Sequence, residues 1–95
     1  MSRRLQPPKI EATIDLHGLT LEEAYARLLP FLASAEARGK RGLLIITGKG
    51  KGALRYELPL WLDSPKIRGK IASIGPAPQE KGGEGALYVL LKKPS

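Results

Sequence analysis

Hydrophobic and polar residues alternate near the start of the chain and then change to helical spacing. The alternation of Ile10, Ala12, Ile14 and Leu16 predicts a strand over residues 10–16 with one buried face. Apolar residues spaced three and four apart then predict one helix over 21–38, kinked at Pro30. Thr20 and Glu23 have the spacing of an N-terminal capping box, and Gly39 is the expected C-terminal cap.

The second half of the chain predicts one more helix and three more strands. The apolar run 43–47 is typical of a strand buried on both faces. Helical spacing over 53–63 predicts the second helix, kinked or shortened at Pro59. The remaining segments are predicted to be a connector over 64–69, a strand over 70–75, a loop over 76–85 and a strand over 86–92 that is apolar enough to lie inside the sheet.

The resulting order is βαβαββ, which predicts an α/β protein of the α+β two-layer type with a four-stranded mixed sheet and two helices. Strand–helix–strand crossovers join parallel strands, so the first three strands should run parallel and the fourth antiparallel. The turn at His17, the loop 48–52 and the loop 76–85 should then meet at one edge, where open α/β sheets bind ligands. Arg38, Lys40 and Arg41 should lie at the opposite edge.

Length and composition predict one domain. The 95 residues divide into a basic, proline-containing arm or linker over 1–9 and a domain over 10–95, and a larger parent chain or assembly stays open. The chain has no cysteine, which excludes disulfides and thiolate metal sites and favours a reducing, cytoplasmic location. Because no apolar run reaches ~18–20 residues and no apolar core follows the N-terminal arginines, we expect neither a membrane span nor a signal peptide.

The charge is strongly basic. Sixteen Lys and Arg residues against nine Asp and Glu give a net charge of +7 and a pI near 10.0. Such a balance favours a polyanionic partner, most simply nucleic acid, over the alternative that the charge serves solubility alone.

Two stretches carry candidate chemistry. Asp15 and His17, the one histidine, are two residues apart, so both side chains of an extended chain point the same way. They are candidates for acid–base catalysis, and the alternative is a purely structural pair. The loop Gly48-Lys49-Gly50-Lys51-Gly52 joins a buried strand to a helix, where backbone N–H groups, the lysines and Arg55 can bind phosphate. The alternative is a solvated turn, and the spacing fits neither a Walker loop nor the dinucleotide fingerprint.

Three motifs together resemble the Smr (small MutS-related) domain family. They are Asp15-Leu16-His17-Gly18-Leu19-Thr20, Thr47-Gly48-Lys49-Gly50 and the stretch 82–89, which begins Gly-Gly-Glu-Gly. The resemblance implies a fold similar to the C-terminal domain of bacterial translation initiation factor three, nucleic-acid binding and, in many members, endonuclease activity. It places Asp15 and His17 at the family's Asp-x-His pair and residues 47–50 at its Thr-Gly-x-Gly loop. One departure from the family is visible: many members carry a basic residue or histidine just before Gly-Gly-x-Gly, and here Glu80-Lys81 stands there, which leaves Lys81 as the basic residue and offers no second histidine.

The residue set favours RNA cleavage without a required cofactor. A two-metal nuclease needs several carboxylates, whereas this edge offers Asp15 and at most Glu84. His17 would move the proton, as base or acid, and Asp15 would orient the His17 ring. The glycine N–H groups and the lysines of 48–52 would stabilise the negative charge that develops on the phosphorane. A single Mg²⁺ on Asp15 and DNA nicking stay open, as do a non-catalytic phosphate-binding module and a protein-interaction domain.

Overall fold

The computed structural model describes residues 9–49, 52–81 and 83–93. The arm predicted over 1–9 therefore lies, apart from Lys9, outside the described residues, and so do Gly50 and Lys51. The elements follow one another as β1 (Ala12–Asp15), α1 (Leu21–Ala37), β2 (Gly42–Ile46), α2 (Leu54–Leu62), α3 (Pro65–Arg68), β3 (Ile71–Pro76), the 3-10 turns η1 (Gln79–Lys81) and η2 (Gly83–Gly85), and β4 (Ala86–Leu91).

Two predicted segments differ from the structure. The connector expected over 64–69 contains the one-turn helix α3, because Pro65 occupies the first helical position, where its fixed φ and missing N–H cost nothing. Ile67 of this turn is 3% exposed and packs on the core. The loop expected over 76–85 contains η1 and η2. Helix α1 is a single helix that includes Pro30, as expected.

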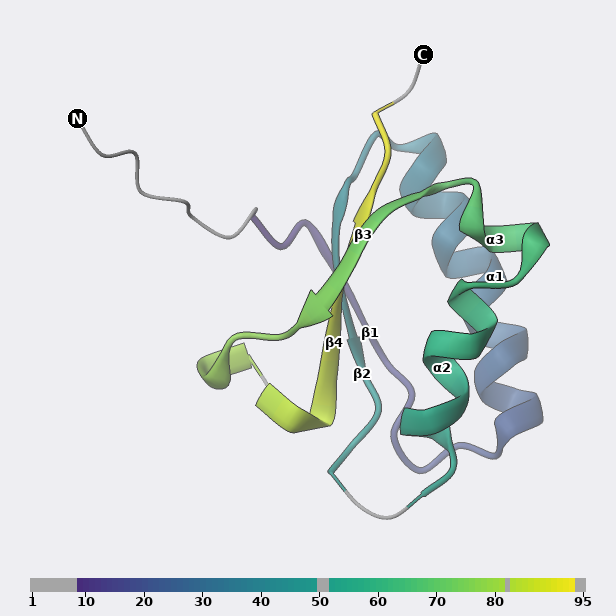
Figure 1. The fold of residues 1–95 in the computed structure, drawn as a ribbon, viewed down its shortest axis with the longest axis vertical. Helices are drawn as coiled ribbons and strands as arrows, with labels where there is room; N and C mark the ends of the chain where they lie inside the picture. Colours follow the sequence, from purple (N-terminus) through teal and green to yellow (C-terminus); the bar gives the residue numbers. More distant parts are fainter. Residues whose placement is uncertain (1–8, 50–51, 82, 94–95) are drawn as a thin grey trace.

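The sheet has the strand order β1-β2-β4-β3. β1 and β2 pair in parallel, and β4 pairs antiparallel with both β2 and β3. The prediction of three parallel strands and an antiparallel, internal fourth strand is therefore confirmed. All three helices lie on one face of the sheet, which gives two layers (Figure 1). None of the helices in the described ranges has the length and apolar character needed to cross a bilayer.

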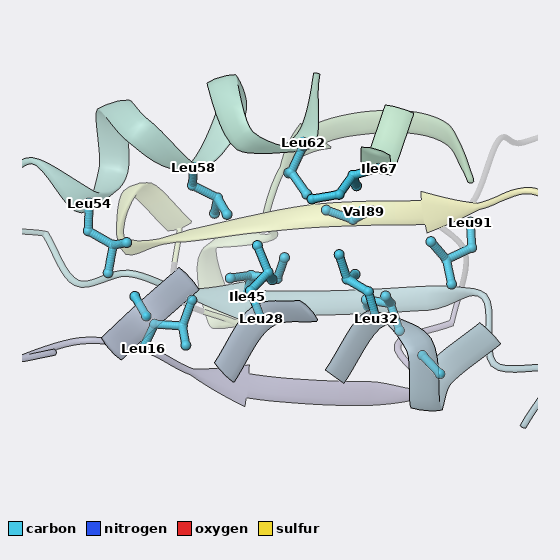
Figure 2. Close-up of a cluster of buried hydrophobic side chains, with 13 residues drawn as sticks. Leu16, Leu28, Leu32, Ile45, Leu54, Leu58, Leu62, Ile67, Val89 and Leu91 are labelled. Atoms are coloured by element: carbon cyan, nitrogen blue, oxygen red, sulfur yellow. The ribbon is translucent and has the colours of Figure 1, made fainter. Parts of the chain in front are cut away.

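The core fills the space between the sheet and the helices. Ile45 of β2 and Val89 of β4 lie at its centre, fully buried, with Leu28 of α1 and Leu58 of α2 packed from the helix layer (Figure 2). Leu16, which follows β1, is also fully buried and belongs to the same cluster. This packing fixes the end of β1 against the body of the domain, and the candidate histidine follows directly.

The start and end of α1 are both fixed by specific hydrogen bonds. The Thr20 hydroxyl accepts from the Glu23 backbone N–H at 3.0 Å, and the Glu23 carboxylate accepts from the Thr20 N–H at 3.0 Å, so the predicted capping box is confirmed. Gly39 follows the helix at φ +72°, and the next N–H, that of Lys40, donates to the Ala35 carbonyl. The chain thereby turns back into β2 at the edge of the sheet opposite His17.

Candidate nucleic-acid site

A tight turn at the end of β1 presents His17 to solvent. The Leu16 N–H still donates to the Ile46 carbonyl of β2 at 2.8 Å, so the parallel ladder extends to this residue. The Leu19 N–H then donates back to the Leu16 carbonyl, and Gly18 adopts φ +81°, as the third residue of a type II turn requires. Leu16 is therefore held in the core while His17, one residue on, stands at the tip of the turn.

Asp15 and His17 form a hydrogen-bonded pair. The His17 ring nitrogen Nδ1 lies 2.6 Å from Asp15 Oδ1, and the same oxygen accepts the His17 backbone N–H at 3.0 Å. The side-chain hydrogen bond from His17, followed by the backbone one, lowers the pKa of Asp15 below its ordinary value. Because the ionised carboxylate can only accept, Nδ1 must carry the proton, and a neutral His17 ring then presents an unprotonated Nε2. The His17 side chain is 66% exposed and that of Asp15 is 49% exposed, so the Nε2 atom of His17 is available to a ligand.

The beginning of the β2–α2 loop is fixed by a glycine from another part of the chain. The Thr47 and Gly48 N–H groups both donate to the Gly85 carbonyl, at 2.8 and 2.9 Å. A Cβ on Gly85 would lie 3.0 Å from Lys49 Cγ and 3.3 Å from the Gly48 carbonyl carbon. Glycine at position 85 therefore lets the two loops touch through their backbones.

The turn after β1 and the loop after β2 enclose an open hollow of about 330 Å³. Its lining residues are His17, Gly18, Thr47, Gly48, Lys49, Gly52 and Arg55. The structure thus brings the Asp-x-His turn beside the glycine–lysine loop, as the parallel order of β1 and β2 predicts. Both lie at the lower edge of the sheet, below the arrowhead of β3 (Figure 1).

The hollow is positively charged on the side of α2. Lys49 and Arg55 both line it, and Arg55 Nη1 reaches the Lys49 carbonyl at 3.5 Å. The N-cap of α2 is Ala53, whose side chain makes no capping hydrogen bond to the first turn of the helix. The helix macrodipole adds partial positive charge at the same end. This arrangement suits an anion such as a phosphodiester.

One predicted hydrogen-bond donor is wrong. The Gly48 N–H was expected to stabilise the negative charge of the phosphate, but it already donates to the Gly85 carbonyl. Gly48 instead allows the close approach of the loop to His17, with φ +89°. Of the other expected N–H donors, Gly52 lines the hollow, and Gly50 lies outside the described residues together with Lys51.

Two further residues of the predicted edge do not line the hollow. Lys81 lies in η1 and Glu84 in η2, and both are exposed. In the described ranges no three His, Asp or Glu side chains gather as a metal-binding group. Sequence reasoning gave no role to Gly85, although it lies within the Gly-Gly-Glu-Gly motif that was noted, and a glycine motif facing another glycine loop was the available signal.

Comparison with known sequences connects this geometry to one family. The family model described as the Smr domain matches residues 14–92. The chain is 40% identical over 80 residues to a protein named endonuclease MutS2 from Solidesulfovibrio magneticus, covering 83% of this chain and 10% of that protein. It is 38% identical over 82 residues to ribosome rescue factor SmrB from Haemophilus influenzae, covering 85% of this chain and 47% of that protein. The chain thus spans about a tenth of one relative and about half of the other.

Solved structures agree with this match. The Smr domain of Thermus thermophilus MutS2 superposes with a TM-score of 0.77 at 35% identity, over 86% of this chain and 99% of that one. YdaL from Escherichia coli, a stand-alone small MutS-related protein, superposes with the same TM-score at 30% identity, over 85% of this chain and 64% of that one.

Proposed function

This chain belongs to the Smr domain family, and we propose that it is an endonuclease that cleaves RNA at the hollow between the β1 turn and the β2–α2 loop. The observation that carries the proposal is the 2.6 Å contact between His17 Nδ1 and Asp15 Oδ1, at a hollow that Lys49 and Arg55 line. A pre-oriented imidazole beside a cationic site is the arrangement that acid–base cleavage of a phosphodiester needs.

His17 Nε2 acts as the general base. It removes the proton from the 2′-hydroxyl of the nucleotide in the hollow, and the 2′-oxygen attacks the neighbouring phosphorus. The bond from phosphorus to the 5′-oxygen breaks, and that oxygen takes up a proton from solvent and leaves as a hydroxyl, while the protonated His17 returns its proton to solvent. The products are a 2′,3′-cyclic phosphate and a free 5′-hydroxyl. Asp15 holds the imidazole with Nδ1 protonated and stabilises the imidazolium that forms.

The cationic side of the hollow stabilises the negative charge on the non-bridging phosphate oxygens in the transition state. Lys49 and Arg55 supply positive charge, and the Gly52 N–H and the first turn of α2 supply backbone donors. Thr47 and Gly48 shape the loop through Gly85. Gly50, Lys51 and Lys81 are proposed as further contacts to the nucleic-acid backbone.

The carboxylates favour RNA over DNA as the substrate. DNA lacks the 2′-hydroxyl, so its nicking needs a water nucleophile, which nucleases commonly activate with metal ions held by several carboxylates. In the described residues, Asp15 is the carboxylate that contacts the histidine of the hollow, and it could hold a single Mg²⁺ through its exposed side. The proposed RNA cleavage therefore needs no added cofactor.

A non-catalytic phosphate-binding module is the second candidate. It is favoured by the hydrogen bond from the His17 backbone N–H to Asp15, because a carboxylate that stabilises its own turn has a structural role without any reaction. In that case the same cations bind nucleic-acid phosphates and His17 only shapes the hollow.

A cleavage assay on labelled single-stranded RNA and DNA of one sequence separates these functions. Wild type, His17→Ala and the surface control Arg27→Ala are compared in EDTA and in Mg²⁺. We expect RNA cleavage in EDTA with a cyclic phosphate end, unchanged in the control and lost in His17→Ala with its affinity retained. Cleavage that disappears in EDTA and returns with Mg²⁺ contradicts the metal-free mechanism. Salt-sensitive binding without cleavage of either strand supports the binding module.

A further inference from the structure

A second cationic surface lies at the opposite edge of the sheet. It forms where the chain enters β2 and β3 and leaves β4, near the C-terminal end of the described chain at the top of the view (Figure 1). A hollow of about 240 Å³ there is lined by five cationic side chains and one carboxylate, Glu36. We call this surface the cationic edge, and its basic residues are Lys40, Arg41, Lys70, Lys92 and Lys93.

Hydrogen bonds join the chain segments that carry the cationic edge. The Leu91 N–H donates to the Arg41 carbonyl and the Lys92 N–H to the Lys70 carbonyl, both at 2.9 Å. Arg41 Nε also donates to the Leu91 carbonyl at 3.1 Å, which holds the guanidinium in place. Because this bond pre-organises the Arg41 guanidinium, less of its side-chain entropy is lost when it binds a phosphate.

Acidic neighbours leave most of this charge uncompensated. Lys70 Nζ lies 3.2 Å from Glu36 Oε1, and in the described ranges this is the one salt bridge among the lining residues. The Glu11 carboxylate, which accepts the backbone N–H groups of Arg41 and Gly42, offsets a second positive charge. Five cations against two carboxylates still leave an excess of positive charge, which is complementary to an anionic partner.

Structural roles explain only part of the cationic edge. Lys40 follows the C-terminus of α1, where a positive charge compensates the helix macrodipole. Lys92 and Lys93 follow β4, which has no comparable dipole. They do not protect a sheet edge either, because β4 is an internal strand. The fold therefore gives Lys92 and Lys93 no structural role at these positions.

We propose that the cationic edge binds the phosphodiester backbone of the same nucleic acid that enters the His17 hollow, as a second, non-cleaving anchor; this rests on the proposed function. The six residue steps from Arg41 to Thr47 along β2 span about 20 Å at ~3.3 Å per residue. That distance corresponds to about six nucleotides of one strand in a stacked helix. Short oligonucleotides can therefore occupy one site only, and longer ones reach both.

The test compares two double variants that remove the same charge. Lys40→Gln/Lys92→Gln removes two cations of the cationic edge but leaves Arg41, which also holds the backbone. Arg27→Gln/Lys66→Gln removes two exposed cations that line neither hollow. Binding of a labelled 15-nucleotide and a 4-nucleotide RNA is measured against salt in the His17→Ala background, so that cleavage is not needed for the readout.

For the long RNA, we expect Lys40→Gln/Lys92→Gln to reduce the slope of log affinity against log salt by about 1.4, since each phosphate contact on a single strand contributes about 0.7. The control pair should leave the slope unchanged, and the difference in affinity between the two pairs should be larger for the 15-nucleotide RNA, which can reach both sites, than for the 4-nucleotide RNA, which can occupy only one. In the His17-containing enzyme, the edge variant should raise KM and leave kcat unchanged. Equal losses in both pairs, or no loss in either, overturn the second anchor while leaving the proposed cleavage intact. If no variant cleaves RNA, the binding results still decide the anchor.

Discussion

His17 and Gly48 come from loops about thirty residues apart, yet a Cβ on Gly48 would lie 3.3 Å from the His17 Cβ. The glycine also adopts φ +89°, which side chains rarely accept. Glycine at this position therefore lets the candidate phosphate-binding loop lie directly against the candidate base.

Replacement of Gly48 by alanine should disturb both stability and the site. The left-handed backbone conformation costs a residue with a Cβ about 1–2 kcal/mol, and the crowded histidine must also shift. We expect a lower free energy of unfolding in urea and weaker RNA cleavage. Gly69→Ala is the matched control, because its backbone lies at φ −63° and a Cβ there meets nothing within 4 Å. Equal losses of stability and of RNA cleavage in the two variants would show that position 48 does not require glycine.

Asp15→Asn should reduce cleavage without removing the histidine. The asparagine amide can donate to Nδ1, which moves the ring proton to Nε2 and leaves no base facing the substrate. We expect kcat to fall by about 10²-fold or more while the Kd for RNA stays within about twofold. Single-turnover cleavage and equilibrium binding measure the two quantities. A variant as active as wild type would remove Asp15 from the mechanism.

The Asp15–His17 pair also predicts a pH dependence of stability. Hydrogen bonds from His17 lower the pKa of Asp15, so the folded state favours the ionised carboxylate. Its contribution is fully present above the ordinary value of 3.8 and is lost as the pH falls through the lowered pKa. Because the pair is exposed, the effect should be at most about 1 kcal/mol.

Urea unfolding of wild type and Asp15→Asn from pH 7 to pH 2.5 measures this contribution. The difference in free energy of unfolding between the two proteins should be constant down to about pH 4 and then shrink. Glu11, whose pKa is lowered chiefly by the Arg41 backbone N–H, titrates in both proteins and cancels in the difference. A difference that grows on acidification would contradict the assigned direction.

Leu16→Ala should destabilise the domain strongly. Leu16 is fully buried between the exposed candidate residues Asp15 and His17, and truncation of such a leucine typically costs about 2–5 kcal/mol. Leu60, which is 65% exposed, provides the control, and its replacement by alanine should change stability by no more than about 0.5 kcal/mol. Thermal or urea unfolding distinguishes them, and similar losses would mean that Leu16 does not anchor the β1 turn.

Local sequence determined the position of the candidate catalytic pair, Asp15 and His17. The alternation that places Leu16 in the core also turns Asp15 and His17 outward, and two-residue spacing suffices for their contact. Likewise, Thr20 and Glu23 cap α1 through groups three residues apart. These features depend on backbone periodicity and short-range hydrogen bonds, so they could be predicted before any tertiary contact was known.

The backbone hydrogen bonds at the start of the β2–α2 loop were decided by tertiary structure alone. The Thr47 and Gly48 N–H groups donate to Gly85, a partner 38 residues from Thr47, because β4 enters the sheet beside β2. The same strand brings Lys92 to Lys40 and Arg41 and so builds the cationic edge. Sequence determined which residues lie next to each other along a strand or turn; strand order determined which distant ones meet, because those contacts exist only when the whole sheet has formed.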